Sequence, residues 1–417
     1  MQNSQASSQE QTLSTQYDNI KARNLNLDLT RGKPGADQLD LSNALDGILD
    51  GNFHAEGTDL RNYGGLDGLN GAKQLGAWLL DVPPEQVLVG GNSSLTLMYH
   101  MVLHAHYLGV RGAESAWNKE GTVKFLCPVP GYDRHFAICQ ELGIQMIPVG
   151  MDEHGPLMDD VERLLRDDPS IKGMWCVPKY SNPTGCVYSA EVIDRIAALG
   201  KIAGPNFRVL YDNAYAVHHL SDSPPALASM LDACRRHGTE DSVVQFASTS
   251  KITFAGAGLA FMAASAANLT AFKKHWNIVS IGPDKLNQQR HVKFLPEQAA
   301  IQDLMRRHRA LIKPKFECVL QALEQNLGNR DMGSWTAPEG GYFVSFYTKP
   351  GLASEVVRLA AEAGVKLTPA GAAFPYGKDP DDSHIRLAPT FPSIDELKQA
   401  MEVFVLCVQL ATVRQRG

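Results

Sequence analysis

Polar and aromatic side chains that could form a binding site follow five short apolar runs in this sequence. In chain order they are Asn92, Ser93 and Ser94, then Tyr132, then Asn182, then Asp212 and Tyr215, and finally Ser248, Ser250 and Lys251. Serines before a helical pattern can present hydroxyls and free N–H groups to an anion, and a lysine amine can bond covalently to a carbonyl group. Each group alone has an ordinary structural explanation as a turn, a helix cap, a core aromatic or a surface charge.

These side chains need a scaffold that brings several strand ends together. Apolar runs typical of strands occur at 87–89, 123–126, 174–177, 209–211, 243–247 and 259–263, and helical stretches at 95–106, 133–141, 190–198 and 269–276. Strands that alternate with helices predict an α/β fold, with a mostly parallel sheet sandwiched by helices. Ligands of such sheets bind at the carboxyl ends of the strands, so we expect the five groups to meet there.

The chain is expected to contain two unequal domains. Residues 1–16 are almost all polar, which predicts a flexible tail. We expect 17–54 to join the smaller domain, 55–315 to form the large domain, and 316–417 to form a small α+β domain. The expected strands of that small domain are 342–347, 366–368 and 385–388, and its expected helices are 353–363 and 394–409.

Composition excludes several classes of protein. Of the 417 residues, 44% are hydrophobic and 20% are charged, which excludes general disorder. A net charge of -6 disfavours nucleic acid as a partner. The sequence has neither a secretory signal nor an apolar run long enough for a membrane helix, so we expect a soluble, cytoplasmic protein. The seven cysteines have no metal-ligand spacing and are expected to be reduced thiols, with no metal site.

The combination of groups is more specific than any one of them. An anion cradle, a stacking ring, a hydrogen-bonding amide, a carboxylate and a lysine are together what a phosphorylated aromatic aldehyde requires. Pyridoxal 5'-phosphate needs a lysine for its Schiff base, an anion beside its pyridine nitrogen and a helix N-terminus for its phosphate. The sequence therefore predicts this cofactor.

The order of these residues resembles fold type I pyridoxal-phosphate enzymes, specifically the class I/II aminotransferases. The resemblance begins near residue 25, includes Asn62-Tyr63-Gly64-Gly65, Asn182-Pro183-Thr184-Gly185, Asp212-x-x-Tyr215 and Ser248-x-Ser250-Lys251, and ends with Arg386. The segments 29–35 (LTRGKPG) and 281–285 (IGPDK) resemble a divergent bacterial subgroup of aspartate aminotransferases.

The resemblance implies a role for each residue. Lys251 would form the Schiff base and then move a proton from the substrate, Asp212 would pair with the pyridinium nitrogen, and Tyr132 would stack on the ring. Asn182 and Tyr215 would bind the ring oxygen. The phosphate would be bound by Asn92, Ser93, Ser94, Ser248 and Ser250, and by Tyr63 of the neighbouring subunit in a homodimer with active sites at the interface. Arg386 would bind the substrate α-carboxylate, helped by Asn182 and the backbone of Gly32.

One position departs from the family pattern. The family usually has a phosphate-binding arginine eight residues after the lysine, and this sequence has Leu259 there. Either hydroxyls, backbone amides and another cation such as Lys285 bind the phosphate, or cofactor affinity is reduced. For the distal carboxylate of a dicarboxylic substrate, Arg31 is the first candidate, with Lys285 and Arg290 as rivals.

The leading functional hypothesis is a ping-pong transaminase that converts L-aspartate and 2-oxoglutarate to oxaloacetate and L-glutamate. The same cofactor chemistry leaves two alternatives open: a transaminase for aromatic or other amino donors, and a pyridoxal-phosphate lyase. A regulatory, aminotransferase-like sensor is a remote alternative, because such a regulator needs a DNA-binding module and only about 20 polar residues precede the first expected ordered segment.

Overall fold

The computed structural model describes residues 2–416, with side-chain surroundings for residues 8–416. An eight-stranded sheet forms its centre. The strand order is β4-β11-β10-β9-β8-β5-β6-β7. The strands are β4 (Val87–Val89), β5 (Lys124–Val129), β6 (Gln145–Asp152), β7 (Gly155–Pro156), β8 (Ile171–Cys176), β9 (Arg208–Asp212), β10 (Val243–Ser248) and β11 (Ala260–Ala263). Pairing is parallel from β10 to β6, while β11 is antiparallel to both its neighbours and β7 is antiparallel to β6. The predicted mostly parallel sheet is confirmed.

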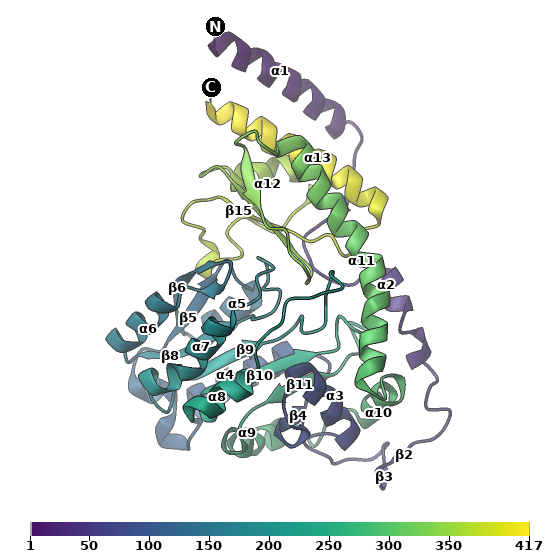
Figure 1. Cartoon of the computed structure of the whole chain (residues 1–417), viewed down its shortest axis with the longest axis vertical. Coiled ribbons are helices and arrows are strands. Elements are labelled where there is room, and N and C mark those ends of the chain that lie inside the picture. Colours follow the sequence, from purple (N-terminus) through teal and green to yellow (C-terminus); the bar gives the residue numbers. More distant parts are fainter. Residues whose placement is uncertain (1, 417) are drawn as a thin grey trace.

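Helices cover both faces of this sheet (Figure 1). They are α3 (Asn70–Leu80), α4 (Ser94–Tyr107), α5 (Asp133–Glu141), α6 (Met158–Asp167), α7 (Ala190–Ala203), α8 (Met230–His237), α9 (Ala266–Val279) and α10 (Lys285–Phe294). Successive residues of a strand point to opposite faces, so Leu210 packs in the core beside α4 and α9, and Tyr211 packs in the core beside α7 and α8. Because both faces are covered, the central strands are mostly apolar.

A smaller sheet lies beside the carboxyl ends of these strands (Figure 1). It has the antiparallel order β12 (Gly333–Trp335), β13 (Val344–Thr348), β15 (His384–Leu387). Strand β1 (Leu27–Asp28) pairs in parallel with β14 (Val365–Lys366). Helices α12 (Ala353–Glu362) and α13 (Ile394–Arg416) belong to the same part of the chain.

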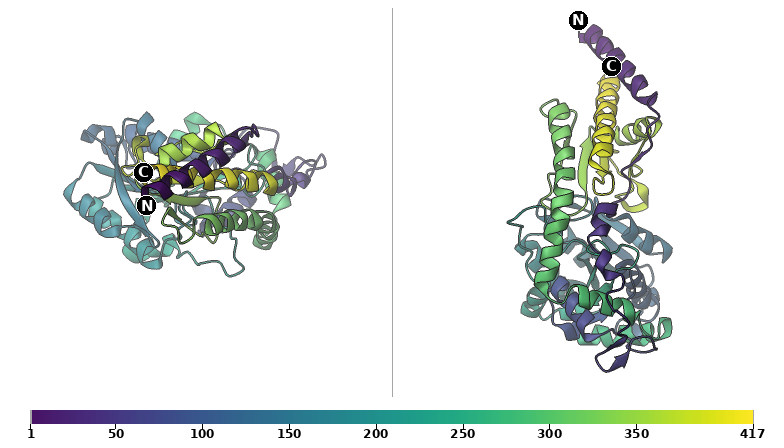
Figure 2. Two further views of the ribbon diagram at one scale, coloured as in Figure 1. Left: turned by 90° about the horizontal axis from the view of Figure 1, so that it is seen from above. Right: turned by 90° about the vertical axis from the view of Figure 1, so that its right-hand side faces the viewer.

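Helix α11 (Gln298–Leu327) runs along both parts of the molecule (Figures 1 and 2). The domain boundary that we expect after residue 315 therefore falls inside a continuous helix, one residue after Pro314. The remaining elements are α2 (Ala36–Asp40), the hairpin β2 (His54–Ala55) and β3 (Thr58–Asp59), and 3-10 turns at Asn43–Leu45, Pro84–Gln86, Ala113–Ser115, Trp117–Glu120, Glu240–Ser242 and Pro375–Gly377.

The N-terminus differs from the expectation of a flexible tail over residues 1–16. Residues Gln2–Lys21 form helix α1, which lies against α13 (Figure 2). Leu13, Tyr17 and Ile20 are buried in the core of the smaller part, and the Tyr17 hydroxyl donates to the Leu359 carbonyl at 2.8 Å. These three apolar residues lie on one face of the helix, and their burial stabilises a segment that is otherwise polar.

Within residues 2–416, no helix has the length and apolar character needed to cross a membrane. All seven cysteines have free thiols.

Candidate active site

A cavity of about 650 Å³ lies where the carboxyl ends of the large sheet face the smaller sheet. Twelve of the residues predicted from the sequence line it: Arg31, Gly32, Ser93, Ser94, Tyr132, Asn182, Asp212, Tyr215, Ser248, Ser250, Lys251 and Arg386. They come from seven loops or strand ends that are far apart in the sequence. The fold therefore brings most of the predicted side chains into one space.

Lys251 follows β10, and its side chain enters the cavity. Its ammonium nitrogen lies 5.1 Å from the centroid of the Tyr215 ring. Burial lowers the pKa of Lys251, and the nearby Asp212 carboxylate opposes this effect. A lowered pKa increases the fraction of neutral amine, the form that acts as nucleophile and base.

Asp212 ends β9 and is held from behind by a histidine that we did not predict. The Asp212 Oδ2 atom lies 3.1 Å from Nε2 of the buried His135, whose ring stacks on Trp175 at a centroid distance of 4.2 Å. The other carboxylate oxygen, Oδ1, is buried and has no hydrogen-bond partner among the described residues. An unpaired buried acceptor costs free energy, so the site is suited to a ligand that donates a hydrogen bond there.

Two phenols complete the floor of the cavity. Burial raises the pKa of Tyr132 to about 12, and Asp212 adds to the effect. Burial also raises the pKa of Tyr215 well above its usual value, with smaller contributions from Tyr132 and Asp212. Without a ligand, both hydroxyls therefore stay protonated at neutral pH and can donate hydrogen bonds.

One end of the cavity has the character of an anion site. Ser94 begins α4, and the preceding Ser93 makes no side-chain cap to the helix within the described residues, so N–H groups of the first turn remain open. Ser248 and Ser250 lie on the adjacent lining. Leu259, at the position of the family's usual arginine, is buried in the core and supplies no charge.

From the smaller sheet, Arg386 projects from β15 and is 7% exposed. Its Nη1 lies 3.3 Å from Asn182 Oδ1 and 3.4 Å from Asp133 Oδ1, and its Nη2 lies 3.3 Å from the Thr30 carbonyl oxygen. Its Nε atom is buried without a partner among the described residues. These contacts are long, so the guanidinium is positioned but keeps capacity to bind a carboxylate.

Gly32 is needed here because the chain passes close to an aromatic ring. A Cβ atom at this position would lie 2.4 Å from Cζ of Phe343, whose ring also supports the Arg386 guanidinium at 4.8 Å. The neighbouring Arg31 is exposed and lines the cavity mouth.

Some predicted residues do not line this cavity. Asn92 instead donates from Nδ2 to the Gly256 carbonyl at 2.9 Å, and its own carbonyl accepts from Ser250 Oγ at 3.1 Å. Lys285 donates to the Gly64 carbonyl at 2.7 Å, and Arg290 is exposed elsewhere. Tyr63 is 82% exposed on the surface. Lys285, a candidate for the phosphate cation, therefore does not line the cavity of this chain.

The structure also adds residues that the sequence analysis missed. Besides His135, the cations Lys33 and Arg134 line the cavity. Arg134 and His135 follow Tyr132 at the start of α5, and this position beside a strand end could have identified them as site residues.

Comparison with known proteins agrees with this geometry. The family model described as "Aspartate amino-transferase" matches residues 1–417. The chain belongs to this family. The predicted resemblance and the expectation of an aminotransferase are both confirmed.

Among relatives of this family, a protein named aspartate aminotransferase from Corynebacterium glutamicum is 45% identical over 95% of this chain and 91% of its own length. The crystal structure of an aspartate transaminase from Corynebacterium glutamicum superposes with a TM-score of 0.96 at 43% identity, covering 100% of this chain and 98% of that one. An aspartate aminotransferase from Thermus thermophilus, solved with maleate, shares the fold, with a TM-score of 0.69 at 16% identity, covering 95% of this chain and 96% of that one.

Proposed function

We propose that the chain is a pyridoxal-phosphate-dependent aminotransferase that uses L-aspartate as amino donor and 2-oxoglutarate as acceptor. The observation that carries the proposal is the meeting of Lys251, Asp212 and Arg386 in one cavity. The names of the Corynebacterium relatives support aspartate as the donor.

The residues fit the proposed cofactor. The unpartnered Asp212 Oδ1 can accept a hydrogen bond from a protonated pyridine nitrogen, and Tyr132 offers a ring face. Asn182 and Tyr215 can bind the ring oxygen, while Ser93, Ser94, Ser248 and Ser250 can bind the phosphate. When bound, the cofactor supplies an electron sink for the substrate Cα–H bond.

The chain's own residues then position the substrate and move a proton. Arg386 binds the α-carboxylate, and its contact with Asn182 keeps the guanidinium in place. Because burial lowers the pKa of Lys251, its neutral Nζ can accept the proton from the substrate Cα and would then deliver it to the aldehyde-derived carbon of the bound cofactor. His135 keeps the Asp212 carboxylate oriented.

The second carboxylate of aspartate requires a second cation. Arg31, Lys33 and Arg134 all line the cavity, whereas Lys285 and Arg290 do not. We keep Arg31 as the first candidate because it is adjacent to Gly32, whose backbone is expected to contact the α-carboxylate.

The proposed active enzyme is a homodimer. Tyr63, Ile278 and Ile281 are 82%, 85% and 63% exposed, which is unusual for large apolar side chains. The loop bearing Ile281 approaches the loop bearing Tyr63, since Gly282 packs against the Gly64 carbonyl. A second subunit that covers this patch would receive Tyr63 in its own site.

A half-reaction panel tests the proposed donor. Purified enzyme reconstituted with pyridoxal phosphate is mixed with each amino acid in turn, without an oxo acid, and its visible absorbance is followed. L-aspartate and L-glutamate are expected to change the spectrum fastest. A faster response to aromatic amino acids would show that the donor is an aromatic amino acid rather than aspartate. Release of ammonia and pyruvate from a β-substituted amino acid would show that the enzyme is a lyase rather than a transaminase.

A further inference from the structure

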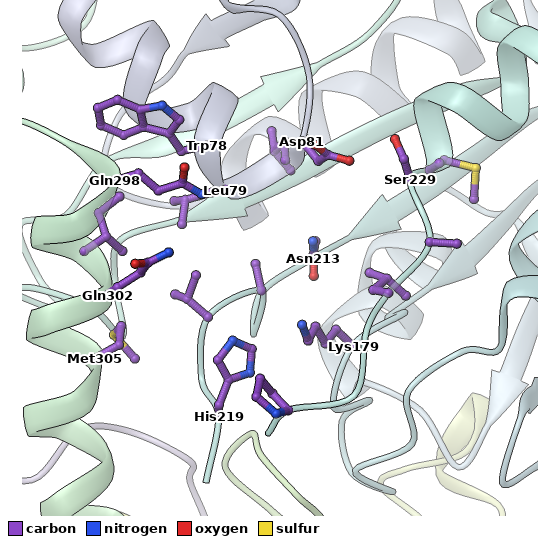
Figure 3. Close-up of a pocket in the computed structure, with 18 of the residues that line it drawn as sticks. Trp78, Leu79, Asp81, Lys179, Asn213, His219, Ser229, Gln298, Gln302 and Met305 are labelled. Atoms are coloured by element: carbon purple, nitrogen blue, oxygen red, sulfur yellow. The ribbon is translucent and has the colours of Figure 1, made fainter. Parts of the chain in front are cut away.

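A second cavity, of about 520 Å³, is lined by Asn213, the residue that follows β9 (Figure 3). It is bounded by the end of α3, the first turns of α11 and the segment that follows β9. Strand alternation separates the two spaces: Asp212 and Ala214 line the active-site cavity, whereas Tyr211 and Asn213 line this one. The two cavities therefore share the end of β9 as a common wall.

The sheet wall of this cavity carries polar atoms without partners. The Tyr211 hydroxyl and the Asn213 Oδ1 atom are buried and have no hydrogen-bond partner among the described residues. Tyr211 is 1% exposed and Asn213 is 8% exposed. Burial raises the pKa of Tyr211 well above its usual value, so the hydroxyl is a donor at neutral pH. Unpaired buried polar groups are rare and mark a place where a ligand or water binds.

The same wall holds a cation. Figure 3 shows the Lys179 amino group pointing toward Asn213. Burial lowers the pKa of Lys179. Among residues 8–416, whose side chains the structure describes, no group forms an ion pair or a hydrogen bond with the Lys179 ammonium.

The other charged groups at this cavity are already compensated or open to water. Arg309 pairs with Asp222 at 2.5 Å, and Arg306 pairs with Asp303 at 2.6 Å. Asp81, at the end of α3, is exposed. Lys179 is thus the cation available to a ligand.

The opposite wall is mostly apolar, with Gln298 and Gln302 of α11 as its polar side chains. Trp78 and Leu79 of α3, Ile301 and Met305 of α11, and Val217 line it. Figure 3 shows Trp78, Leu79 and Met305 on the side away from Lys179. A ligand that satisfies both walls has an anionic head and an apolar body.

From these two walls we infer that this cavity is a second binding site, for a small monocarboxylate with an apolar or aromatic tail. The carboxylate binds the Lys179 ammonium and the Tyr211 hydroxyl, and the tail lies against Trp78 and Met305. The site is separate from the one that binds the substrate, because Arg386 and Lys251 do not line it.

Calorimetric titration of the cofactor-loaded enzyme with 3-phenylpropanoate tests this site, since this probe has neither an amino nor an oxo group to react. Saturable binding is expected. Lys179→Met should weaken it at least about tenfold, because a hydrogen bond to a charged group is lost. Lys313→Met, which removes the same charge from an exposed position on α11, is the matched control and should bind as the native enzyme does.

Two further variants locate the probe. Gln302 is exposed and lines the cavity, so Gln302→Glu should fold normally and weaken binding by repulsion. The probe should also quench part of the tryptophan fluorescence, and this part should be absent in Trp78→Phe. Absence of saturable binding would overturn the inference. So would binding that survives both Lys179→Met and Gln302→Glu, or binding that Arg386→Gln abolishes.

Discussion

His135 and Asp212 are the pair of side chains on which the proposed chemistry depends most closely. Replacing His135 by Phe keeps a ring against Trp175 but removes the 3.1 Å contact to Asp212. We expect kcat/KM for L-aspartate to fall about tenfold or more, since one hydrogen bond to a charged group contributes roughly 1.5–3 kcal/mol. Steady-state kinetics and the pH profile of the cofactor absorbance measure the effect.

The control for this variant is His154→Phe, because His154 is an exposed histidine outside the cavity. Its kinetics should match the native enzyme. If His135→Phe also retained native kinetics and the native absorbance profile, the positioning role of His135 would be wrong.

Arg31 is predicted to decide the preference for a dicarboxylic donor. Arg31→Met should raise KM for L-aspartate about tenfold, because an ion pair at a partly exposed site is lost, and should leave kcat/KM for L-alanine nearly unchanged. Lys33→Met and Arg134→Met serve as comparisons, since both cations line the same cavity. A larger effect on aspartate from either of these would transfer the role to that residue.

Site residues could be predicted from the sequence where a chemically reactive side chain closely follows a strand. Lys251, Asp212 and Ser94 could be placed because parallel strand ends meet at one edge of a sheet. His135 was missed because its role depends on the direction in which the first turn of α5 points. The contacts of Lys285 could not be predicted either, since they depend on a loop some 220 residues earlier in the chain.

Strand β15 contains a buried histidine, His384, that is expected to make the stability of the folded chain depend on pH. Burial lowers the pKa of His384 to about 4, Arg386 adds to the effect and Asp379 opposes it. The unfolded chain, with a pKa near 6.5, therefore binds more protons than the folded chain between these values. The free energy of unfolding should decrease as the pH falls from 6.5 to about 4, by up to about 3 kcal/mol from this residue.

Chemical denaturation at several pH values measures this dependence. His384→Gln can keep a hydrogen bond to Ser345 Oγ, which lies 2.9 Å from His384 Nε2, but cannot be protonated. The variant should lose less stability than the native protein over the same pH interval. Equal losses in the two proteins would show that His384 does not contribute.

Helix α1 is predicted to stabilise the smaller part of the molecule. Tyr17→Ala removes a buried ring and the hydrogen bond to Leu359, and should lower the free energy of unfolding by about 2 kcal/mol. Asp18→Ala, on the exposed face of the same helix, is the matched control. Equal melting temperatures for the two variants would contradict a stabilising role for α1.

Strands β4, β5, β8, β9, β10 and β11 and helices α4, α5, α7 and α9 could be predicted because each carries an apolar pattern, whereas β6, β7, α3, α6, α8 and α10 were not predicted. Helix α1 was missed because Gln, Ser and Thr dominate its sequence, and its three buried residues are too few to outweigh that composition. Helix α11 continues across the expected domain boundary and packs against α13, a tertiary contact that a local pattern does not contain.

At the scale of the whole molecule, the proposal requires two copies of the chain. Ile278→Glu should place a charge in the exposed apolar patch and shift the protein from dimer to monomer, with loss of activity. Sedimentation and activity at matched concentrations test this expectation. Glu85→Gln, a conservative change outside the patch, should leave the dimer intact. An Ile278→Glu dimer with native activity would place the interface elsewhere.

Subunit mixing tests whether Tyr63 acts in the neighbouring site. Tyr63→Phe and Lys251→Ala subunits are each expected to have little activity alone, and mixed dimers should regain activity because one of their two sites has both native residues. Failure of mixed dimers to regain activity would indicate that Tyr63 serves its own subunit, and native activity of Tyr63→Phe alone would indicate that Tyr63 has no catalytic role.

The proposed function requires Lys251, Asp212 and Arg386 to form a site that accepts the amino group of L-aspartate. A single-turnover reaction tests it directly: enzyme loaded with pyridoxal phosphate is mixed with L-aspartate without any oxo acid, and oxaloacetate is measured. We expect oxaloacetate equal in amount to the bound cofactor, loss of the visible absorbance band, and neither change in Lys251→Ala. A band that persists with every amino acid, or release of ammonia in place of amino-group retention, would contradict it.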